Sequence, residues 1–132
     1  MTRFWITLRQ GVEFVLSSLA IMRGGEIFVP KIPTMKVTDV ARCIAPDLPQ
    51  RTVGIRPGEK LHEVMITADD ARSTIELDDR YVIEPAFAYW SRAPYTEDGA
   101  KLVDENFVFA SDGNTHWLDD QGFAALLKES RS

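Results

Sequence analysis

The sequence GIRPGEKLHE at residues 54–63 has the pattern of a strand that ends in a turn and leads into a helix. Pro57 suits a first helical position, because its missing N–H would have no partner there and its φ angle is already helical. The pattern therefore predicts a strand over residues 51–55 and a helix from Pro57 to about Met65. Arg56 would lie beside the helix N-terminus, where unpaired amides and the helix dipole favour an anion.

Arg56 and Glu59 together suggest a nucleotide site. A guanidinium can bind two phosphate oxygens at once, which a lysine ammonium cannot do. Three residues later, Glu59 carries a carboxylate that can accept hydrogen bonds from sugar hydroxyls next to those phosphates. A plainer interpretation also fits, in which Arg56 is a solvated surface charge and Glu59 is an ordinary acidic residue of a first helical turn. These two residues alone leave both interpretations open.

The composition indicates one ordinary globular domain, or a large part of one. The chain has 132 residues, and 45% of them are hydrophobic. Its 15 basic and 20 acidic residues give a net charge of -5, which disfavours nucleic acid or an anionic membrane as a partner. No apolar run approaches the roughly 20 residues that span a bilayer, and Arg9 and Glu13 interrupt any secretory signal. The single Cys43 excludes an internal disulfide, so we expect a cytoplasmic protein.

The rest of the chain mixes helical and extended patterns. Thr7 and Gln10 have the spacing of a capping box, and apolar residues then recur at helical spacing until a Gly-Gly pair at residues 24–25. Residues 37–45 predict a second helix with Thr38 as its N-cap. Other patterns predict a strand at 26–30, a capped turn at Thr67, extended segments at 74–77, 80–83 and 106–110, a loop with exposed aromatic side chains at 85–104, and a last helix after Asp119 or Asp120. The predicted class is mixed α and β.

No motif for catalysis or cofactor binding is present. The chain lacks a Gly-x-Gly-x-x-Gly turn, a Walker-type phosphate loop and a Gly-x-Ser-x-Gly nucleophile elbow. His62 and Glu63 begin a zinc-protease pattern, but Ile66 stands where the second histidine is required. With one cysteine and two histidines, we expect no metal site. We therefore assign no catalytic residue, and we expect His62 to be a helix-surface or hydrogen-bonded residue.

Three segments, in this order, resemble one enzyme family. They are MTRFWIT at residues 1–7, EIFVPKIP at residues 26–33, and the run from Gly54 to Ile66. The chain resembles the NADP-dependent, inverting UDP-N-acetylglucosamine 4,6-dehydratases. These enzymes belong to the extended short-chain dehydrogenase/reductase (SDR) superfamily and serve flagellin-glycosylation (pseudaminic acid) and surface-polysaccharide pathways. The resemblance is strong through about Pro85 and looser beyond it.

The resemblance implies that residues 1–132 form a single region, the C-terminal substrate-binding part of such an enzyme. In the family, the N-terminal half carries the Rossmann dinucleotide-binding fold, which holds NADP, and the catalytic Tyr-x-x-x-Lys pair. Here none of the three tyrosines, Tyr81, Tyr89 and Tyr95, has a lysine four residues later. The resemblance therefore implies an α/β chain that lacks the dinucleotide-binding half, binds no cofactor itself and is inactive alone.

By resemblance, Arg56 contacts the diphosphate of UDP-N-acetylglucosamine and Glu59 contacts the ribose region. Arg3 matches a second family arginine near the diphosphate, and two phosphates in a cleft need more than one counter-charge. The alternative for Arg3 is a flexible charge close to the first residue. An apolar strand at residues 26–30 without its family neighbours would invite pairing, so we expect self-association or pairing with an N-terminal half.

Two other functions stay open. The chain could be a non-catalytic UDP-sugar-binding or interaction module, or a fragment of a related nucleotide-sugar epimerase. The pattern of an arginine followed three residues later by an acid is widespread among sugar-nucleotide enzymes, so it does not separate these classes. The segments at residues 1–7 and 26–33 are what favour the dehydratases.

Overall fold

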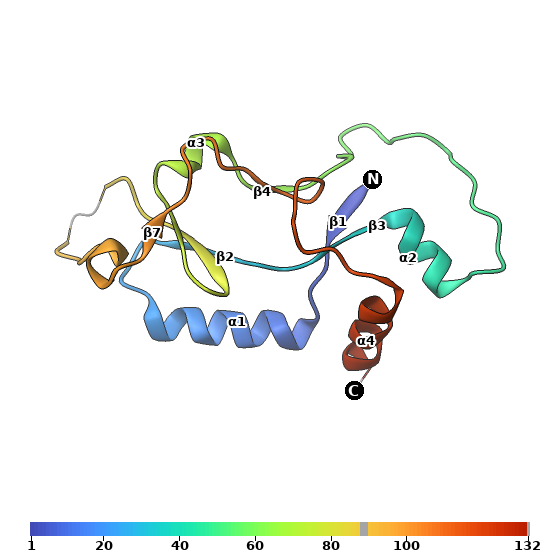
Figure 1. The fold of residues 1–132 in the computed structure, drawn as a ribbon, viewed down its shortest axis with the longest axis horizontal. Coiled ribbons are helices and arrows are strands. Elements are labelled where there is room, and N and C mark those ends of the chain that lie inside the picture. The colour runs from blue at the N-terminus through green and yellow to red at the C-terminus, as the bar shows by residue number, and fades with distance from the viewer. Residues whose placement is uncertain (88–89, 132) are drawn as a thin grey trace. The chain divides into compact units, whose positions relative to one another are not determined.

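The computed structural model describes residues 1–87 and 90–131, and its elements are drawn in Figure 1. The chain divides into two compact units, each made of separate segments. Unit 1 contains residues 1–11, 32–64 and the stretch from Ala110 onward, and unit 2 contains residues 12–31 and 65–109. Both units combine helices with short strands, so the predicted mixed α and β class is confirmed.

Three elements contain points at which the chain passes from one unit to the other: α1 (Leu8–Ile21), β4 (Val64–Ile66) and β8 (Phe109–Ala110). The last two pair with each other. The predicted capping box of α1 is confirmed, because Gln10 N donates to Thr7 Oγ1 and Thr7 N donates to Gln10 Oε1, each over 3.1 Å. In the described part of the chain, no helix has the length and apolar character needed to cross a membrane.

Unit 1 is built around one apolar cluster. Its strand β1 (Thr2–Phe4) pairs antiparallel with β3 (Thr34–Lys36), with Arg3 opposite Met35. Helix α2 (Val37–Ile44) follows β3 directly and packs against α4 (Asp120–Ser130). The buried residues of the cluster are Met35, Val40 and Phe123, and Trp5, Cys43, Leu118 and Leu127 pack around them. The strand that carries Arg3 is therefore fixed by the core through its neighbour β3.

Helices α2 and α4 of unit 1 begin in different ways. Helix α4 has the predicted N-cap, because the Asp119 carboxylate accepts a hydrogen bond of 2.7 Å from Gly122 N. The predicted Thr38 cap of α2 is wrong, since the helix begins at Val37 with Lys36 in the N-cap position and no side-chain cap. Val37 N instead donates to Met1 O over 3.1 Å, so a backbone carbonyl satisfies an amide that a cap would otherwise serve.

Unit 2 contains a four-stranded antiparallel sheet. Its strand order is β2 (Ile27–Pro30), β6 (Arg80–Ile83), β5 (Thr74–Glu76) and β7 (Lys101–Leu102). The predicted strand and the two predicted extended segments are thus confirmed, and so is the Thr67 cap, which opens the short helix α3 (Ala68–Ala71). Ile75, Val82 and Tyr95 form the core, and Tyr95 belongs to the short 3-10 helix η1 (Tyr95–Asp98).

Two predictions in unit 2 need correction. The strand expected at 106–110 is reduced to β8, because a turn bends the chain before it, with Phe107 N donating to Asp104 O over 2.9 Å. In the expected loop at 85–104, Phe87 and Trp90 are exposed, but Tyr95 is only 5% exposed and lies in the core. Tyr89, also predicted to be exposed, lies outside the described residues.

Candidate functional site

The segment that carries Arg56 is a turn rather than the start of a helix. Residues 51–63 contain neither strand nor helix, so the predicted strand at 51–55 and the helix from Pro57 are wrong. Arg56 to Glu59 form a β-turn, closed by a hydrogen bond of 3.0 Å from Glu59 N to Arg56 O. Pro57 at the second position and Gly58, with φ +79°, at the third are typical of a type II turn. A left-handed Gly58 ends any helix there, so an anion would meet side chains instead of helix amides.

The side chains of Arg56 and Glu59 lie together on this turn. Glu59 Oε2 accepts a hydrogen bond of 3.0 Å from Arg56 N and lies 3.9 Å from Arg56 Nε. The Arg56 side chain is 88% exposed, whereas that of Glu59 is 26% exposed. Exposed ion pairs of this length contribute little to stability. The Glu59 carboxylate therefore acts mainly through its hydrogen bond to Arg56 N, which stabilises the turn. Most of the Arg56 guanidinium stays accessible to a ligand.

Arg3 reaches the same segment from strand β1. Its Nη2 donates to Lys60 O over 2.9 Å, its Nη1 donates to Thr2 O over 2.7 Å, and its Nε lies 3.9 Å from Glu63 Oε1. Arg3 thus contacts the residue that follows Glu59, although 57 positions separate Arg3 from Lys60, whereas Arg56 and Glu59 contact each other on the turn. These contacts hold Arg3 in place, in contrast to the flexible charge that was its alternative.

A hydroxyl cluster that the sequence did not predict supports this region. Thr2 Oγ1 lies 2.8 Å from His62 Nδ1 and 2.6 Å from Ser111 Oγ. Ser111 Oγ accepts a hydrogen bond of 2.8 Å from Glu63 N, and Ser111 N donates to Glu63 O over 2.8 Å. Glu63 Oε2 in turn accepts from Phe4 N over 3.0 Å. The end of the segment that carries Arg56 is therefore anchored to β1 and to Ser111.

Nothing local in the sequence could have revealed this cluster. Thr2 is 60 positions from His62 and 109 from Ser111, and no periodic pattern links residues so far apart. His62 is hydrogen-bonded, which was one of its two predicted roles, but it does not lie on a helix. The buried hydroxyls of Thr2 and Ser111 are 4% and 0% exposed at the residue level, so their bonds are made away from water.

Replacement of Ser111 with alanine should destabilise unit 1 by about 1–3 kcal/mol, the cost of a buried donor that loses its partner. The change removes the acceptor of Glu63 N and one neighbour of the Thr2 hydroxyl. Urea unfolding followed by tryptophan fluorescence measures the loss. Ser130→Ala is the matched control, because the Ser130 hydroxyl donates to Leu127 O within α4 and Ser130 is exposed. Equal stability of the two variants would contradict the anchoring role of Ser111.

Two features bear on metal and dinucleotide binding: the side chains that could bind a metal ion, and the Gly-Gly pair at residues 24–25. Within residues 1–87 and 90–131, no group of three or more His, Cys, Asp or Glu side chains is placed to hold a metal ion. Gly24 and Gly25 have φ angles of +107° and +80°, but they connect helix α1 to strand β2. A dinucleotide-binding turn runs in the opposite order, from strand to helix. These residues therefore do not fit NADP.

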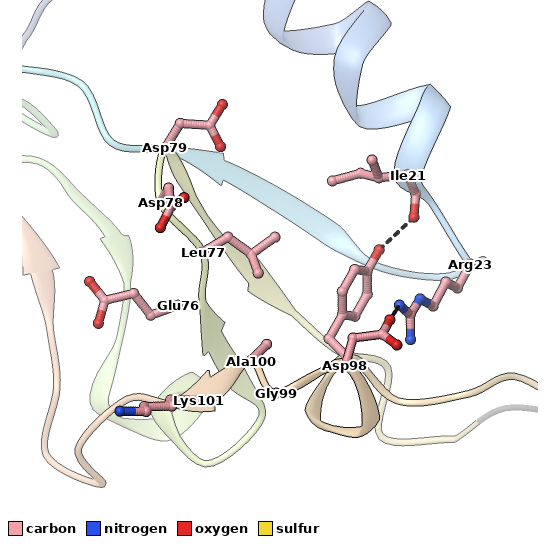
Figure 2. Close-up of a pocket in the computed structure, with 11 residues that line it drawn as sticks. Ile21, Arg23, Glu76, Leu77, Asp78, Asp79, Asp98, Gly99, Ala100 and Lys101 are labelled. Carbon is pink, nitrogen blue, oxygen red and sulfur yellow. Dashed lines mark hydrogen bonds and ion pairs between the residues drawn. The ribbon is translucent and has the colours of Figure 1, made fainter.

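Unit 2 has a hollow of about 770 Å³, and its lining residues are drawn in Figure 2. Four carboxylates line it, from Glu76, Asp78, Asp79 and Asp98. Three of them are already paired with cations: Glu76 with Lys31, Asp79 with Arg80, and Asp98 with Arg23. The lining also contains the cations of Arg23 and Lys101, so no arginine there is as free of carboxylate neighbours as a diphosphate site requires, and we take the Arg56 turn of unit 1 as the candidate anion site.

Tyr95 beside this hollow should make unit 2 sensitive to alkali. Its hydroxyl lies 2.9 Å from Ile21 O and 3.2 Å from Glu26 Oε1 (Figure 2 shows the bond to Ile21). Burial, and then the Glu26 carboxylate, raise the pKa of Tyr95 from 10 to about 12. A raised pKa favours the neutral form in the folded state, so the stabilisation is complete below pH 10 and is lost between pH 10 and about 12.

The expected loss over this pH window is about 2–3 kcal/mol in the free energy of unfolding. Urea unfolding at a series of pH values measures it. Tyr95→Phe is the reference, because all other groups titrate in both proteins and only the Tyr95 contribution is removed. The wild-type chain should lose more stability with rising pH than the variant. Parallel pH profiles would show that Tyr95 ionises equally well in the folded and unfolded chains.

The two units and the cationic turn define an α/β chain with a candidate anion site but no dinucleotide-binding turn of its own. Residues 1–85 match a family model described as polysaccharide biosynthesis protein. The match covers well over half of the chain, so the chain belongs to this family.

Individual relatives show which enzymes of this family the chain resembles. Two proteins named UDP-N-acetylglucosamine 4,6-dehydratase (inverting), from two strains of Campylobacter jejuni, are 43% and 46% identical over 98% of this chain. A UDP-glucose 4-epimerase from Rickettsia canadensis is 31% identical over 78% of the chain. The chain is therefore homologous to the inverting dehydratases, as its sequence segments predicted. It spans 40% of the length of the two dehydratases and 31% of the epimerase.

A solved structure agrees on the fold. The X-ray structure of Pen from Bacillus thuringiensis matches 99% of this chain with a TM-score of 0.76, at 24% sequence identity. The chain covers 38% of that protein. The arrangement of elements seen here thus also occurs as one part of a longer polypeptide.

Proposed function

We propose that this chain is the UDP-sugar-binding, C-terminal region of an inverting UDP-N-acetylglucosamine 4,6-dehydratase that serves surface-glycan or flagellin-sugar (pseudaminic acid) biosynthesis in the cytoplasm. The observation that carries the proposal is the Arg56 turn, where a largely exposed guanidinium lies next to an ordered carboxylate. This turn belongs to a chain that is 43% and 46% identical to two dehydratases of that name.

Each predicted site residue has a role in this proposal. Arg56 binds the diphosphate, preferably through two parallel hydrogen bonds. Glu59 accepts hydrogen bonds from the ribose hydroxyls, and its bond to Arg56 N keeps it on the correct side of the turn. Arg3 adds a second positive charge near the diphosphate while its bond to Lys60 O holds the segment. The neighbouring side chain of Lys60 is exposed and adds a further cation.

The reaction itself needs a part that this chain does not contain. In the intact family enzyme, NADP supplies the hydride chemistry, but Gly24 and Gly25 do not form a dinucleotide-binding turn in this chain. We propose that the chain binds and orients the nucleotide sugar and is inactive alone. Pairing with an N-terminal half, or self-association where that half is missing, completes the proposal.

Titration calorimetry of the chain tests the proposal. UDP and UDP-N-acetylglucosamine should bind weakly, whereas uridine, which lacks the phosphates, and NADP⁺ should not bind detectably. Inorganic pyrophosphate is a useful third ligand, because it separates diphosphate binding from the contribution of the ribose. Binding of NADP⁺, or equal binding of uridine and UDP, would remove the basis of the proposal.

The epimerase relative supports a second candidate, a part of a nucleotide-sugar 4-epimerase. The two reactions give products of different mass. Dehydration of UDP-N-acetylglucosamine gives a product lighter by one water, whereas epimerisation gives an isomer of unchanged mass. Mass spectrometry of the product from the complete enzyme therefore separates them. Failure to form any product while UDP still binds would favour the non-catalytic binding module.

A further inference from the structure

Within unit 2, two serine side chains of helix α1 face the sheet. Ser17 Oγ and Ser18 Oγ accept hydrogen bonds of 2.8 Å and 2.7 Å from the guanidinium of Arg80, which is 5% exposed. The same guanidinium lies over the ring of Phe14, 4.6 Å from its centroid. Residues 14, 17 and 18 share one face of a helix, because positions three and four apart are neighbours. This face is the one that the sheet of unit 2 covers.

The opposite face of α1 is aliphatic and exposed. It consists of Val12, Val15, Leu16, Leu19 and, just beyond the helix, Met22, which are 51%, 57%, 61%, 59% and 48% exposed. We call these five residues the outward face. Their spacing is that of an amphipathic helix packed against a core. In this chain the pattern is inverted, since serines face the unit and aliphatic side chains face away from it.

A groove continues the outward face toward strand β2. It has a volume of about 270 Å³. Its lining residues are Phe14, Val15, Ser18, Leu19, Met22, Glu26 and Phe28. Glu26 is the one charged residue of this lining. Its carboxylate already accepts hydrogen bonds from Gly24 N over 2.7 Å and from Arg92 Nη2 over 3.0 Å. The groove therefore suits apolar side chains from a partner.

We infer that the outward face and this groove are the surface on which the rest of the longer enzyme packs, through an aliphatic surface of its own. The inference rests on the proposed function, because it takes the chain to be one part of such an enzyme. The two dehydratases contain 60% of their length outside the region that this chain matches. Pen likewise carries this fold, matched over 99% of the chain, within a longer protein. Contiguous apolar surfaces of this kind usually mark an interaction site.

The test uses the remainder of the Campylobacter jejuni dehydratase, that is, the part outside its matched segment. Titration calorimetry measures its binding to the unchanged chain and to the double variant Leu16→Gln, Leu19→Gln. The dissociation constant should rise at least about tenfold. Leu102→Gln is the matched control, because Leu102 is similarly exposed (56%) but lies on β7, and it should change the constant less than about twofold.

A second measurement covers the case in which the isolated remainder does not fold. The remainder and this chain are joined in one polypeptide, and the double substitution should lower its melting temperature while leaving that of the isolated chain unchanged. Unchanged values in both proteins would overturn the inference. A second result would also overturn it: the isolated chain forms a dimer that the double substitution abolishes, and the joined polypeptide is unaffected. A second copy of the chain, and not the remainder of the enzyme, would then cover the outward face.

The outcome is independent of UDP binding. The outward face belongs to unit 2, and the double variant should bind UDP as the unchanged chain does. A chain that binds the remainder through α1 but not UDP would contradict the proposed function of the Arg56 turn and leave the packing surface established. Loss of UDP binding in the double variant would show instead that these substitutions disturb the fold, and would count against the inference.

Discussion

Replacement of Arg56 with alanine should weaken UDP binding to this chain by about 1.5–3 kcal/mol, the range for a hydrogen bond to a charged group. This corresponds to a roughly 10- to 150-fold higher dissociation constant. The guanidinium is 88% exposed before binding, so its loss should barely change the stability of the folded chain. In a complete enzyme that buries the ion pair, the loss should rise to roughly 2–5 kcal/mol. Titration calorimetry with UDP measures both values.

Two further variants test whether the Arg56 guanidinium itself, and not positive charge alone, binds UDP. Arg56→Lys keeps the charge but loses the planar pair of donors, so its affinity should lie between those of the wild type and Arg56→Ala. Arg51→Ala removes an exposed arginine from the same connection and should change the affinity less than about twofold. If Arg51→Ala and Arg56→Ala weakened UDP binding equally, general positive charge would explain the binding and the assignment of Arg56 would be lost.

The elements that the sequence predicted correctly are those whose ends are encoded locally. Thr7 with Gln10, Thr67 with Asp70, and Asp119 with Gly122 each close a helix start within four residues. Such short-range bonds depend on residue type and spacing alone. The strands at 27–30, 74–76 and 80–83 were also predictable, because they are short runs of apolar and β-branched residues bounded by turns.

The prediction for the Arg56 segment is wrong because a helix-start signal and a turn signal compete there. Proline at the first position of a helix and proline at the second position of a type II turn have the same φ angle. Gly58 decides between them, and its φ of +79° is compatible only with the turn. The Pro-Gly pair was therefore the signal that mattered, and the acidic residue after it was not evidence for a helix.

The candidate site was predictable only in part, for a different reason. Arg56 and Glu59 are close in sequence, so their proximity followed from spacing. The contact of Arg3 with Lys60 O joins residues 57 positions apart, and that of Thr2 with Ser111 spans 109 positions. Contacts of this range are set by strand pairing and core packing, which a single sequence does not encode in any local pattern. The same limit applies to α1, whose periodicity predicted a helix but not which of its faces is exposed.

Replacement of Phe123 with alanine should destabilise unit 1 by about 3–5 kcal/mol, the cost of removing a buried aromatic ring and leaving a cavity. Phe123 is 2% exposed and meets the Trp5 ring edge-on, with centroids 5.3 Å apart. It also packs with Met35, which is 1% exposed and lies opposite Arg3 in the β1–β3 pair. A loosened Met35 would disturb the strand that carries Arg3, so UDP affinity should fall together with stability.

Urea unfolding followed by tryptophan fluorescence measures the stability, and hydrogen exchange of the β1 and β3 amides locates the change in unit 1. Phe123→Leu keeps most of the apolar volume and should cost clearly less than the alanine variant. Leu48→Ala is the control in the same unit, because Leu48 is 69% exposed and its loss should stay within about 0.5 kcal/mol. An alanine variant at position 123 that lost less than about 1 kcal/mol, or that lost stability while binding UDP normally, would contradict the link between this core and the arginine site. Native proteins have only about 5–15 kcal/mol of stability in total, so the expected loss is a large fraction of that total.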